Sequence, residues 1–121
     1  MIIGQCREHH EKVSSTNMVA LSKLRTGRPE EGTVITASFQ ESGRGQMGNK
    51  WESEAGKNLL MSIVLYPSGI KAGEQFIISQ AVSLAVFDLV KEKTAEVKIK
   101  WPNDIYVRND KIAGVLIENS I

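Results

Sequence analysis

The sequence has one cysteine, Cys6, and no long apolar run. A single cysteine excludes an internal disulfide framework and a cysteine-rich zinc site, and it is typical of a reducing cytoplasm. No stretch approaches the roughly 18 consecutive apolar residues of a membrane span, and the first residues lack the basic segment and apolar run of a secretory signal. These absences predict a cytoplasmic chain that neither crosses nor binds a membrane.

Excess charge of either sign is also missing. Fifteen Lys and Arg residues face fourteen Asp and Glu residues, for a net charge of +1. Such a balance provides no overall field for nucleic acid or an anionic membrane, so any bound anion must be met by a local cluster. With 41% hydrophobic and 24% charged residues, the composition is typical of one soluble globular domain, or part of one.

The N-terminal segment predicts little regular structure. Residues 2–6 favour a short strand, and residues 6–15, "CREHHEKVSS", favour an exposed polar chain. His9 and His10 are adjacent, and adjacent side chains point apart on a helix or a strand. A solvated pair is therefore the preferred interpretation over a metal site.

A helix and two strands are expected next. Residues 16–26 combine a Ser-Thr start, apolar periodicity and a following Gly27, which together predict a helix. Residues 32–39, "GTVITASF", are rich in β-branched side chains and predict a strand. Residues 58–66, "NLLMSIVLY", form a continuous apolar run of strand length, which predicts a strand in the sheet interior with both faces covered.

The C-terminal part predicts a second helix and several strands. Residues 74–93 follow helical spacing and are apolar over most of the girth, which predicts a helix packed deep against the sheet. Residues 97–121 alternate as two or three strands, with a hairpin turn at residues 108–110. The predicted class is α+β, with a mainly antiparallel sheet and helices packed on it.

The segment "GRGQMGNKW", residues 43–51, fits a G-x-G-x-x-G pattern. A dinucleotide loop needs a helix directly after the third glycine and an acidic residue about twenty positions later, and both are missing. A phosphate loop needs Lys directly after the last glycine and then Ser or Thr, but Asn49, Lys50 and Trp51 stand there. What remains is a loop with two cations, Arg44 and Lys50, and a Trp face for a purine. A solvated hairpin loop with its Trp in the core is an equal alternative.

A second constellation lies in "KIKWPNDIYVRNDKIAG", residues 98–114. If residues 105–107 and 111–114 pair as a hairpin, Lys111 lies near Asp104, and a cation and an acid flank one cleft. The alternative is structural, with Asn103 and Asp104 as a turn signal and Lys111 as an exposed strand charge.

Together these motifs resemble the biotin protein ligases, within the superfamily that also contains the lipoate ligases. The matching segments keep their order along the chain: "SSTN" at 14–17, "SFQESGRGQMGNKW" at 38–51, "NLLMSIVL" at 58–65, "KWPNDIYV" at 100–107 and "KIAGVLIE" at 111–118. The resemblance implies the fold shared by biotin ligases and class II aminoacyl-tRNA synthetases. It covers the N-terminal half of a catalytic domain, so that the expected sheet is incomplete.

The resemblance also implies chemistry. Such enzymes activate biotin with ATP and Mg²⁺ to biotinyl-adenylate, then pass the biotinyl group to a lysine of a biotin carboxyl carrier domain of a carboxylase. Lys111 and Arg44 are the implied catalytic residues, and no protein metal site is implied. The implied biotin-binding residues are Ser15, Thr16, Gln40, Gly43, Arg44 and Gly114. The implied ATP and adenylate residues are Lys50, Trp51, Asn103, Asp104 and Lys111. Residues 45–49 would close as a lid over the adenylate.

Departures from the family pattern qualify this interpretation. Gln46 and Asn49 stand where the family often has basic residues, which shifts adenylate retention toward Lys50 and Lys111. The chain lacks a helix-turn-helix domain and a C-terminal barrel domain, and open sheet edges favour pairing with a second copy. Two alternatives stay open: a lipoate or octanoyl transferase, although "RRxSGGG" is absent, and a non-catalytic biotin-binding fragment.

Overall fold

The chain forms two compact units in this computed structural model, which describes residues 1–45 and 48–120. The first unit comprises Met1–Pro67 together with Glu118–Ile121, and the second comprises Ser68–Ile117. The chain therefore leaves the first unit once and returns to it at its C-terminal end. Each unit is described by itself.

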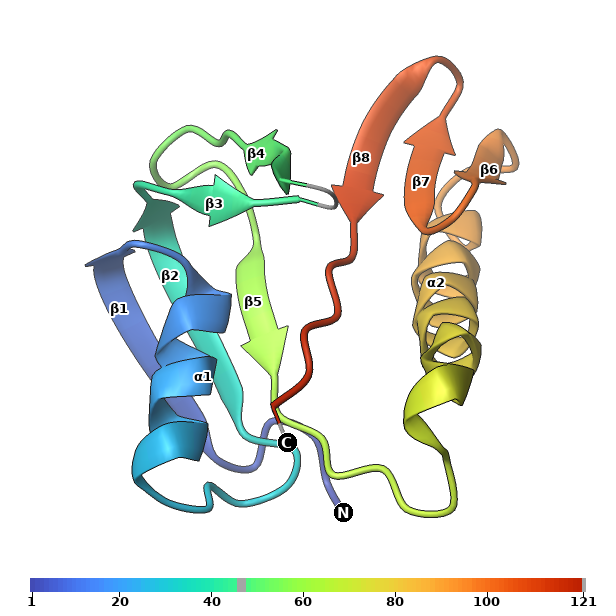
Figure 1. Cartoon of the computed structure of the whole chain (residues 1–121). Helices are drawn as coiled ribbons and strands as arrows, with labels where there is room; N and C mark the ends of the chain where they lie inside the picture. The colour runs from blue at the N-terminus through green and yellow to red at the C-terminus, as the bar shows by residue number, and fades with distance from the viewer. Residues whose placement is uncertain (46–47, 121) are drawn as a thin grey trace. The chain divides into compact units, whose positions relative to one another are not determined.

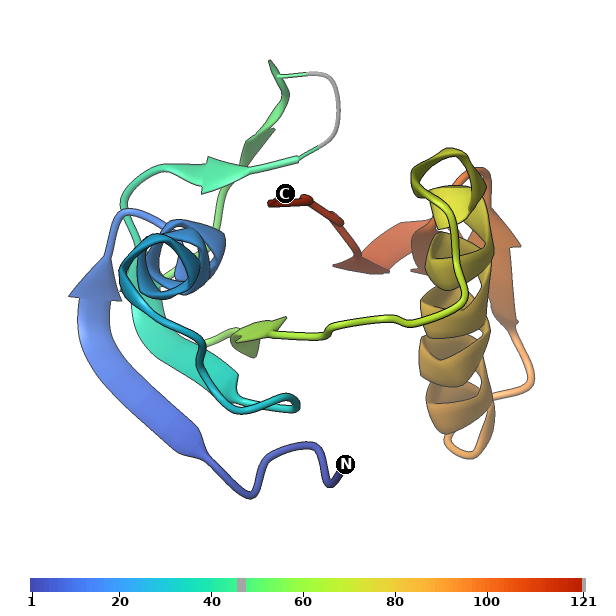
Figure 2. The same ribbon diagram turned by 60° about the horizontal axis from the view of Figure 1, so that its bottom comes forward.

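The first unit is built on a three-stranded sheet with the order β1-β2-β5. β1 (Arg7–Val13) runs parallel to β2 (Val34–Gln40), and β2 runs antiparallel to β5 (Leu60–Ile63). A parallel pair requires a crossover connection, and α1 (Thr16–Thr26) supplies it. Figures 1 and 2 show α1 lying across one face of this sheet.

The core of the first unit lies between α1 and the sheet. Ile35 is fully buried against Ala20 of the helix and Val64 at the end of β5. Val19, Leu24 and Tyr66 pack around this cluster. The predicted helix at 16–26 is confirmed at both ends. Its first turn is capped because the Ser15 Oγ accepts a hydrogen bond from the Met18 N–H at 3.0 Å.

The prediction for the N-terminal segment is wrong. Residues 2–6 form no strand, and the segment expected to be an exposed chain contains β1. β1 is an edge strand in this sheet with polar side chains on both faces, so it carries no apolar alternation for a sequence pattern to detect. His9 and His10 point to opposite faces, as predicted: His9 Nδ1 lies 2.8 Å from Thr36 Oγ1, and His10 Nε2 lies 2.5 Å from Glu8 Oε2.

The strand predicted at 58–66 is confirmed as β5, but the expected cover on both faces is wrong. Leu60 and Ser62 are 5% and 6% exposed and face α1, whereas Met61 and Ile63 on the other face are 46% and 38% exposed. In the described part of the chain, helix α1 covers only one face of this strand. The apolar run therefore predicted the strand correctly, but the burial of both of its faces incorrectly.

Two short strands follow β2 along the glycine-rich segment. β3 (Gly43–Arg44) and β4 (Lys50–Trp51) pair antiparallel, with Gly43 opposite Trp51 and Arg44 opposite Lys50. The Gly45 N–H donates to the Asn49 carbonyl oxygen at 2.6 Å, which extends the ladder by one bond.

The second unit combines a helix with a three-stranded meander. A 3-10 turn, η2 (Ala72–Glu74), leads into α2 (Gln75–Lys91). β6 (Val97–Lys100), β7 (Asp104–Val107) and β8 (Asp110–Gly114) follow in the order β6-β7-β8, each pair antiparallel. The predicted hairpin turn is confirmed between β7 and β8, where Arg108 has a φ of 57°. The predicted α+β class with a mainly antiparallel sheet is confirmed.

The expectation that the second helix is packed deep against the sheet is wrong. α2 contacts β6 and β7, and its Ser83 is 2% exposed, but Ile77, Leu84 and Leu89 are 53%, 54% and 63% exposed. A helix with apolar residues on several sides needs cover on each of them, and the meander provides it on one side. No helix in the described residues is long and apolar enough to span a membrane.

Candidate functional site

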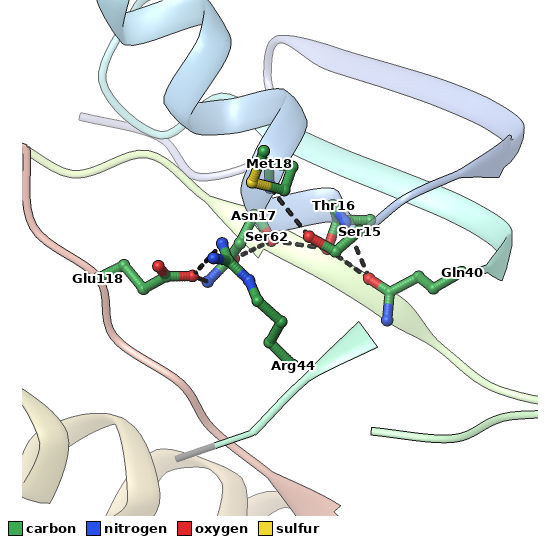
Figure 3. Close-up of polar contacts among 8 residues, drawn as sticks. All are labelled: Ser15, Thr16, Asn17, Met18, Gln40, Arg44, Ser62 and Glu118. Carbon is green, nitrogen blue, oxygen red and sulfur yellow. Dashed lines mark hydrogen bonds and ion pairs between the residues drawn. The ribbon is translucent and has the colours of Figure 1, made fainter. Parts of the chain in front are cut away.

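A polar cluster surrounds the N-terminus of α1 in the first unit (Figure 3). Ser15 and Thr16 are each 3% exposed. The Thr16 backbone N–H donates to Gln40 Oε1 at 2.8 Å, and the Thr16 hydroxyl lies 3.2 Å from the same oxygen. Gln40, at the end of β2, is thereby held with its carbonyl oxygen toward the helix and its NH₂ group directed away.

The cluster continues from Thr16 toward the C-terminal segment. The Thr16 and Ser62 hydroxyls are 2.7 Å apart, and the Ser62 hydroxyl donates to Asn17 Oδ1. Asn17 Nδ2 donates to Glu118 Oε1 at 3.1 Å, and Arg44 Nη2 donates to the same oxygen at 2.7 Å. A continuous chain of hydrogen bonds thus joins α1, β2, β3, β5 and the segment after β8.

Gly43 lies where the backbone of β3 passes close to β4 and to Gln40. A Cβ atom added at Gly43 would clash with the Trp51 carbonyl oxygen and would lie 2.8 Å from Gln40 Nε2. No other residue type fits there without displacing the strand pair. The structure therefore brings five predicted biotin residues together in one unit: Ser15, Thr16, Gln40, Gly43 and Arg44.

The ladder of β3 and β4 carries the predicted nucleotide residues of the first unit. Lys50 is exposed and Trp51 is half-buried on β4, directly opposite Arg44 and Gly43. The predicted lid at residues 45–49 and the role of Gln46 in adenylate retention fall partly outside the described residues, since Gln46 and Met47 are not among them.

The second unit holds the remaining predicted residues. Lys111 Nζ lies 3.0 Å from Asp104 Oδ1, with the two side chains 35% and 27% exposed. Their proximity follows from the hairpin, because Lys111 pairs with Tyr106 and Asp104 pairs with Gly114. The predicted approach of the cation and the acid is confirmed. Gly114 ends β8 and is exposed.

Asn103 is 2% exposed, unlike its neighbour Asp104. Its Nδ2 donates to the Val115 carbonyl oxygen at 2.6 Å and to Ser79 Oγ at 3.3 Å. The amide therefore ties the start of β7 to α2 and to the segment after β8. Within residues 1–45 and 48–120, no group of three His, Cys, Asp or Glu side chains is placed to hold a metal ion.

Electrostatics perturb one carboxyl group near this helix. Lys23 Nζ lies 2.5 Å from Glu8 Oε1 and His10 Nε2 lies 2.5 Å from Glu8 Oε2. Hydrogen bonds from Lys23 and then His10 hold the pKa of Glu8 below its ordinary value. The group joins β1 to α1.

Sequence reasoning missed three members of the cluster: Asn17, Ser62 and Glu118. A signal existed for each of them. Ser62 is the one serine inside the apolar run "NLLMSIVLY", and a buried hydroxyl needs a partner. Asn17 closes the "SSTN" motif and Glu118 closes "KIAGVLIE", both quoted for the resemblance without a role for these residues.

Comparison with known proteins identifies relatives that match most of the chain. The pattern of the biotin/lipoate A/B protein ligase family matches residues 10–121. The bifunctional ligase/repressor BirA of Bacillus subtilis is 34% identical over 119 residues, which cover 97% of this chain and 36% of that protein. The biotin–[acetyl-CoA-carboxylase] ligase of Paracoccus denitrificans is 38% identical over 113 residues, covering 90% of this chain and 45% of that protein.

Solved structures agree with this match. The biotin protein ligase from Aquifex aeolicus in complex with biotin and ATP superposes with a TM-score of 0.76 at 32% identity, covering 96% of this chain and 47% of that one. The biotin protein ligase from Leishmania major in complex with biotin gives 0.76 at 31% identity, covering 93% and 51%. The chain thus spans about half the length of these structures, and the predicted biotin-ligase-like fold is confirmed. The chain belongs to the biotin/lipoate A/B protein ligase family.

Proposed function

We propose that the chain carries the biotin-binding and adenylate-forming residues of a biotin protein ligase. The reaction joins biotin to ATP as biotinyl-adenylate and then transfers the biotinyl group to a lysine of a carboxylase carrier domain. The observation that carries this proposal is the hydrogen-bonded cluster of Thr16, Gln40 and Arg44, in a chain whose relatives include ligases solved with biotin and with ATP.

The cluster suits an uncharged bicyclic ligand with a polar edge. The ureido group of biotin offers one carbonyl acceptor and two N–H donors, so its site needs donors and acceptors in fixed directions. Gln40 is fixed by Thr16, which leaves its NH₂ group as a directed donor. Ser15 and Thr16 supply the hydroxyls, and Gly43 allows a ligand to approach the backbone.

Lys111 is the proposed catalytic cation of the first half-reaction. A carboxylate oxygen of biotin attacks the α-phosphorus of ATP, the bond to the bridging oxygen breaks, and pyrophosphate leaves. Two anions must approach each other, so a cation that contacts the reacting oxygens lowers the barrier. The ion pair with Asp104 at 3.0 Å holds the Lys111 ammonium beside the start of β7. Arg44 and Lys50 are the proposed supporting cations.

Trp51 and the turn before β7 are proposed to bind the nucleotide. Trp51 offers an aromatic face for adenine, and Asn103 anchors the backbone that presents Asp104. Mg²⁺ would enter with ATP as part of the substrate, bound by phosphate oxygens. In the second half-reaction the amine of the carrier lysine attacks the acyl carbon, and AMP leaves.

A biotin-binding module without turnover is the second candidate, because the chain spans 36% to 51% of the four ligases named above. Transfer of labelled biotin separates the two. The chain is incubated with biotin, MgATP and a purified carrier domain, and labelled carrier is detected on a denaturing gel. Labelling that requires ATP supports the ligase. Biotin binding by calorimetry without any labelled carrier supports the module, and the absence of both contradicts the proposal.

A further inference from the structure

We propose that Glu118 is a positioning residue of the biotin site, which sets the direction of Arg44 and of the hydrogen bonds that end at Gln40. This inference rests on the proposed function. Glu118 itself is assigned no contact with substrate. Its effect passes through the side chains that it holds.

The geometry places one carboxylate oxygen between two site residues. Glu118 Oε1 accepts from Arg44 Nη2 at 2.7 Å and from Asn17 Nδ2 at 3.1 Å. The Glu118 side chain is 26% exposed and that of Arg44 is 40% exposed, so the pair is partly withdrawn from water. Figure 3 shows the Arg44 and Asn17 donors meeting at the Glu118 carboxylate. A charge-assisted bond in this setting orders a long side chain more firmly than a fully exposed pair does.

A carboxylate accepts hydrogen bonds and donates none, and this fixes the direction of the whole chain of bonds. Because Asn17 must present its NH₂ group to Glu118, its carbonyl oxygen faces Ser62 and accepts the Ser62 proton. The Ser62 oxygen is then an acceptor for the Thr16 hydroxyl, 2.7 Å away.

The same logic reaches Gln40. With its hydroxyl proton used by Ser62, Thr16 holds the Gln40 carbonyl oxygen mainly through its backbone N–H. The Gln40 NH₂ group then points out of the cluster as a donor. Because it can only accept, the Glu118 carboxylate therefore sets which atoms of the site donate and which accept.

The opposite role would be a block, in which the Glu118 carboxylate occupies Arg44 and must leave before a ligand binds. The bond to Asn17 argues against this role. An anion that only blocked the site would need to pair with Arg44 alone. Glu118 also accepts a hydrogen bond from Asn17, so it is part of the network that links Asn17, Ser62 and Thr16. The two roles predict opposite effects of removing the charge.

The test compares biotin binding by the unsubstituted chain, Glu118→Gln and Glu118→Asp, with Glu54→Gln as the control. Glu54 is a matched carboxylate of the same unit, paired with Lys57 in an exposed contact at 3.0 Å. Glu118→Gln keeps the size and an acceptor but removes the charge. Loss of a charge-assisted bond predicts biotin affinity lower by about tenfold or more. Glu118→Asp keeps the charge and is expected to retain more affinity than Glu118→Gln, and Glu54→Gln is expected to bind as the unsubstituted chain does.

Two further readouts exclude a general structural effect. Without urea, the folded fraction of Glu118→Gln, measured by circular dichroism, is expected to match that of Glu54→Gln, so the loss of affinity cannot come from unfolding. In the ligand-free chain, the guanidinium protons of Arg44, followed by NMR on arginine-labelled protein, are expected to exchange faster in Glu118→Gln than in Glu54→Gln.

The outcomes are distinct. Unchanged or tighter biotin binding by Glu118→Gln overturns the positioning role and leaves the proposed function standing. A folded fraction that falls in parallel with affinity, or Arg44 exchange that does not change, also overturns it. Absence of biotin binding by the unsubstituted chain overturns the proposed function, and the positioning role with it.

Discussion

Replacing Thr16 with valine tests whether the buried cluster stabilises the first unit and shapes the biotin site together. The substitution preserves side-chain shape and removes the hydroxyl of Thr16, a residue that is 3% exposed. That hydroxyl supplies the bond to Ser62 at 2.7 Å, while the longer contact to Gln40 at 3.2 Å shares its single proton. One net hydrogen bond is lost, and Ser62 keeps Asn17 as a partner. We expect the free energy of unfolding to fall by about 1–2 kcal/mol.

Urea denaturation measures this change. With a slope of about 2 kcal/mol per molar, in the middle of the range for small proteins, the midpoint should fall by about 0.5–1 M. Biotin affinity, measured by calorimetry, should fall by about tenfold, since 1.4 kcal/mol corresponds to a factor of ten.

Thr26→Val is the matched control on the same helix. Its hydroxyl donates to the Ser22 and Lys23 carbonyl oxygens in an exposed last turn, and the expected change is within about 0.5 kcal/mol. Equal midpoints for Thr16→Val and Thr26→Val would refute the claim that the cluster is a stabilising network. A lower midpoint with unchanged biotin affinity would separate the cluster from the ligand site.

Three other predictions follow from single positions. Lys111→Ala should slow adenylate formation in single turnover by about 100-fold or more with biotin affinity retained, whereas an unchanged rate would remove Lys111 from the mechanism. Gly43→Ala should weaken biotin binding because its Cβ meets the Trp51 carbonyl; Gly27→Ala, with open space around it, is the control, and equal affinities would contradict the close approach. The pKa of Glu8 is lowered in the folded chain, so its contribution to stability is present above the ordinary value of 4.5 and lost as the pH falls through the lowered value. Urea titrations at a series of pH values should show that the free energy of unfolding falls less steeply toward acid pH in Glu8→Gln than in the unsubstituted chain. Equal slopes would show that Glu8 does not contribute to the acid loss of stability.

The elements that the sequence predicted best carry their own boundary signals. Helix α1 has Ser15 as a side-chain cap and Gly27 after its last turn, so its limits are local. The hairpin of β7 and β8 has turn residues between two alternating runs, which also placed Lys111 beside Asp104. Such features depend on neighbours a few residues away and can be found without the fold.

The features that the sequence missed depend on distant partners. β1 is recognisable only through its pairing with β2, because polar side chains lie on both of its faces and leave no apolar alternation in the sequence. Arg44 and Asn17 meet Glu118 across 74 and 101 positions of the chain. The exposure of Met61 and Leu84 could not be predicted either, since an apolar run shows that a surface needs cover and not what covers it. The single-domain organisation, the cytoplasmic location, the absence of nucleic acid binding and the homodimer remain predictions.

Biotin-dependent exchange of labelled pyrophosphate into ATP tests the central claim most directly. The assay needs the chain, biotin, MgATP and labelled pyrophosphate, and no carrier, because adenylate formation is reversible. The proposed site predicts exchange above background only with biotin present, and its loss in Lys111→Ala. Absence of exchange by a chain that binds both biotin and ATP in calorimetry would contradict adenylate formation at this site.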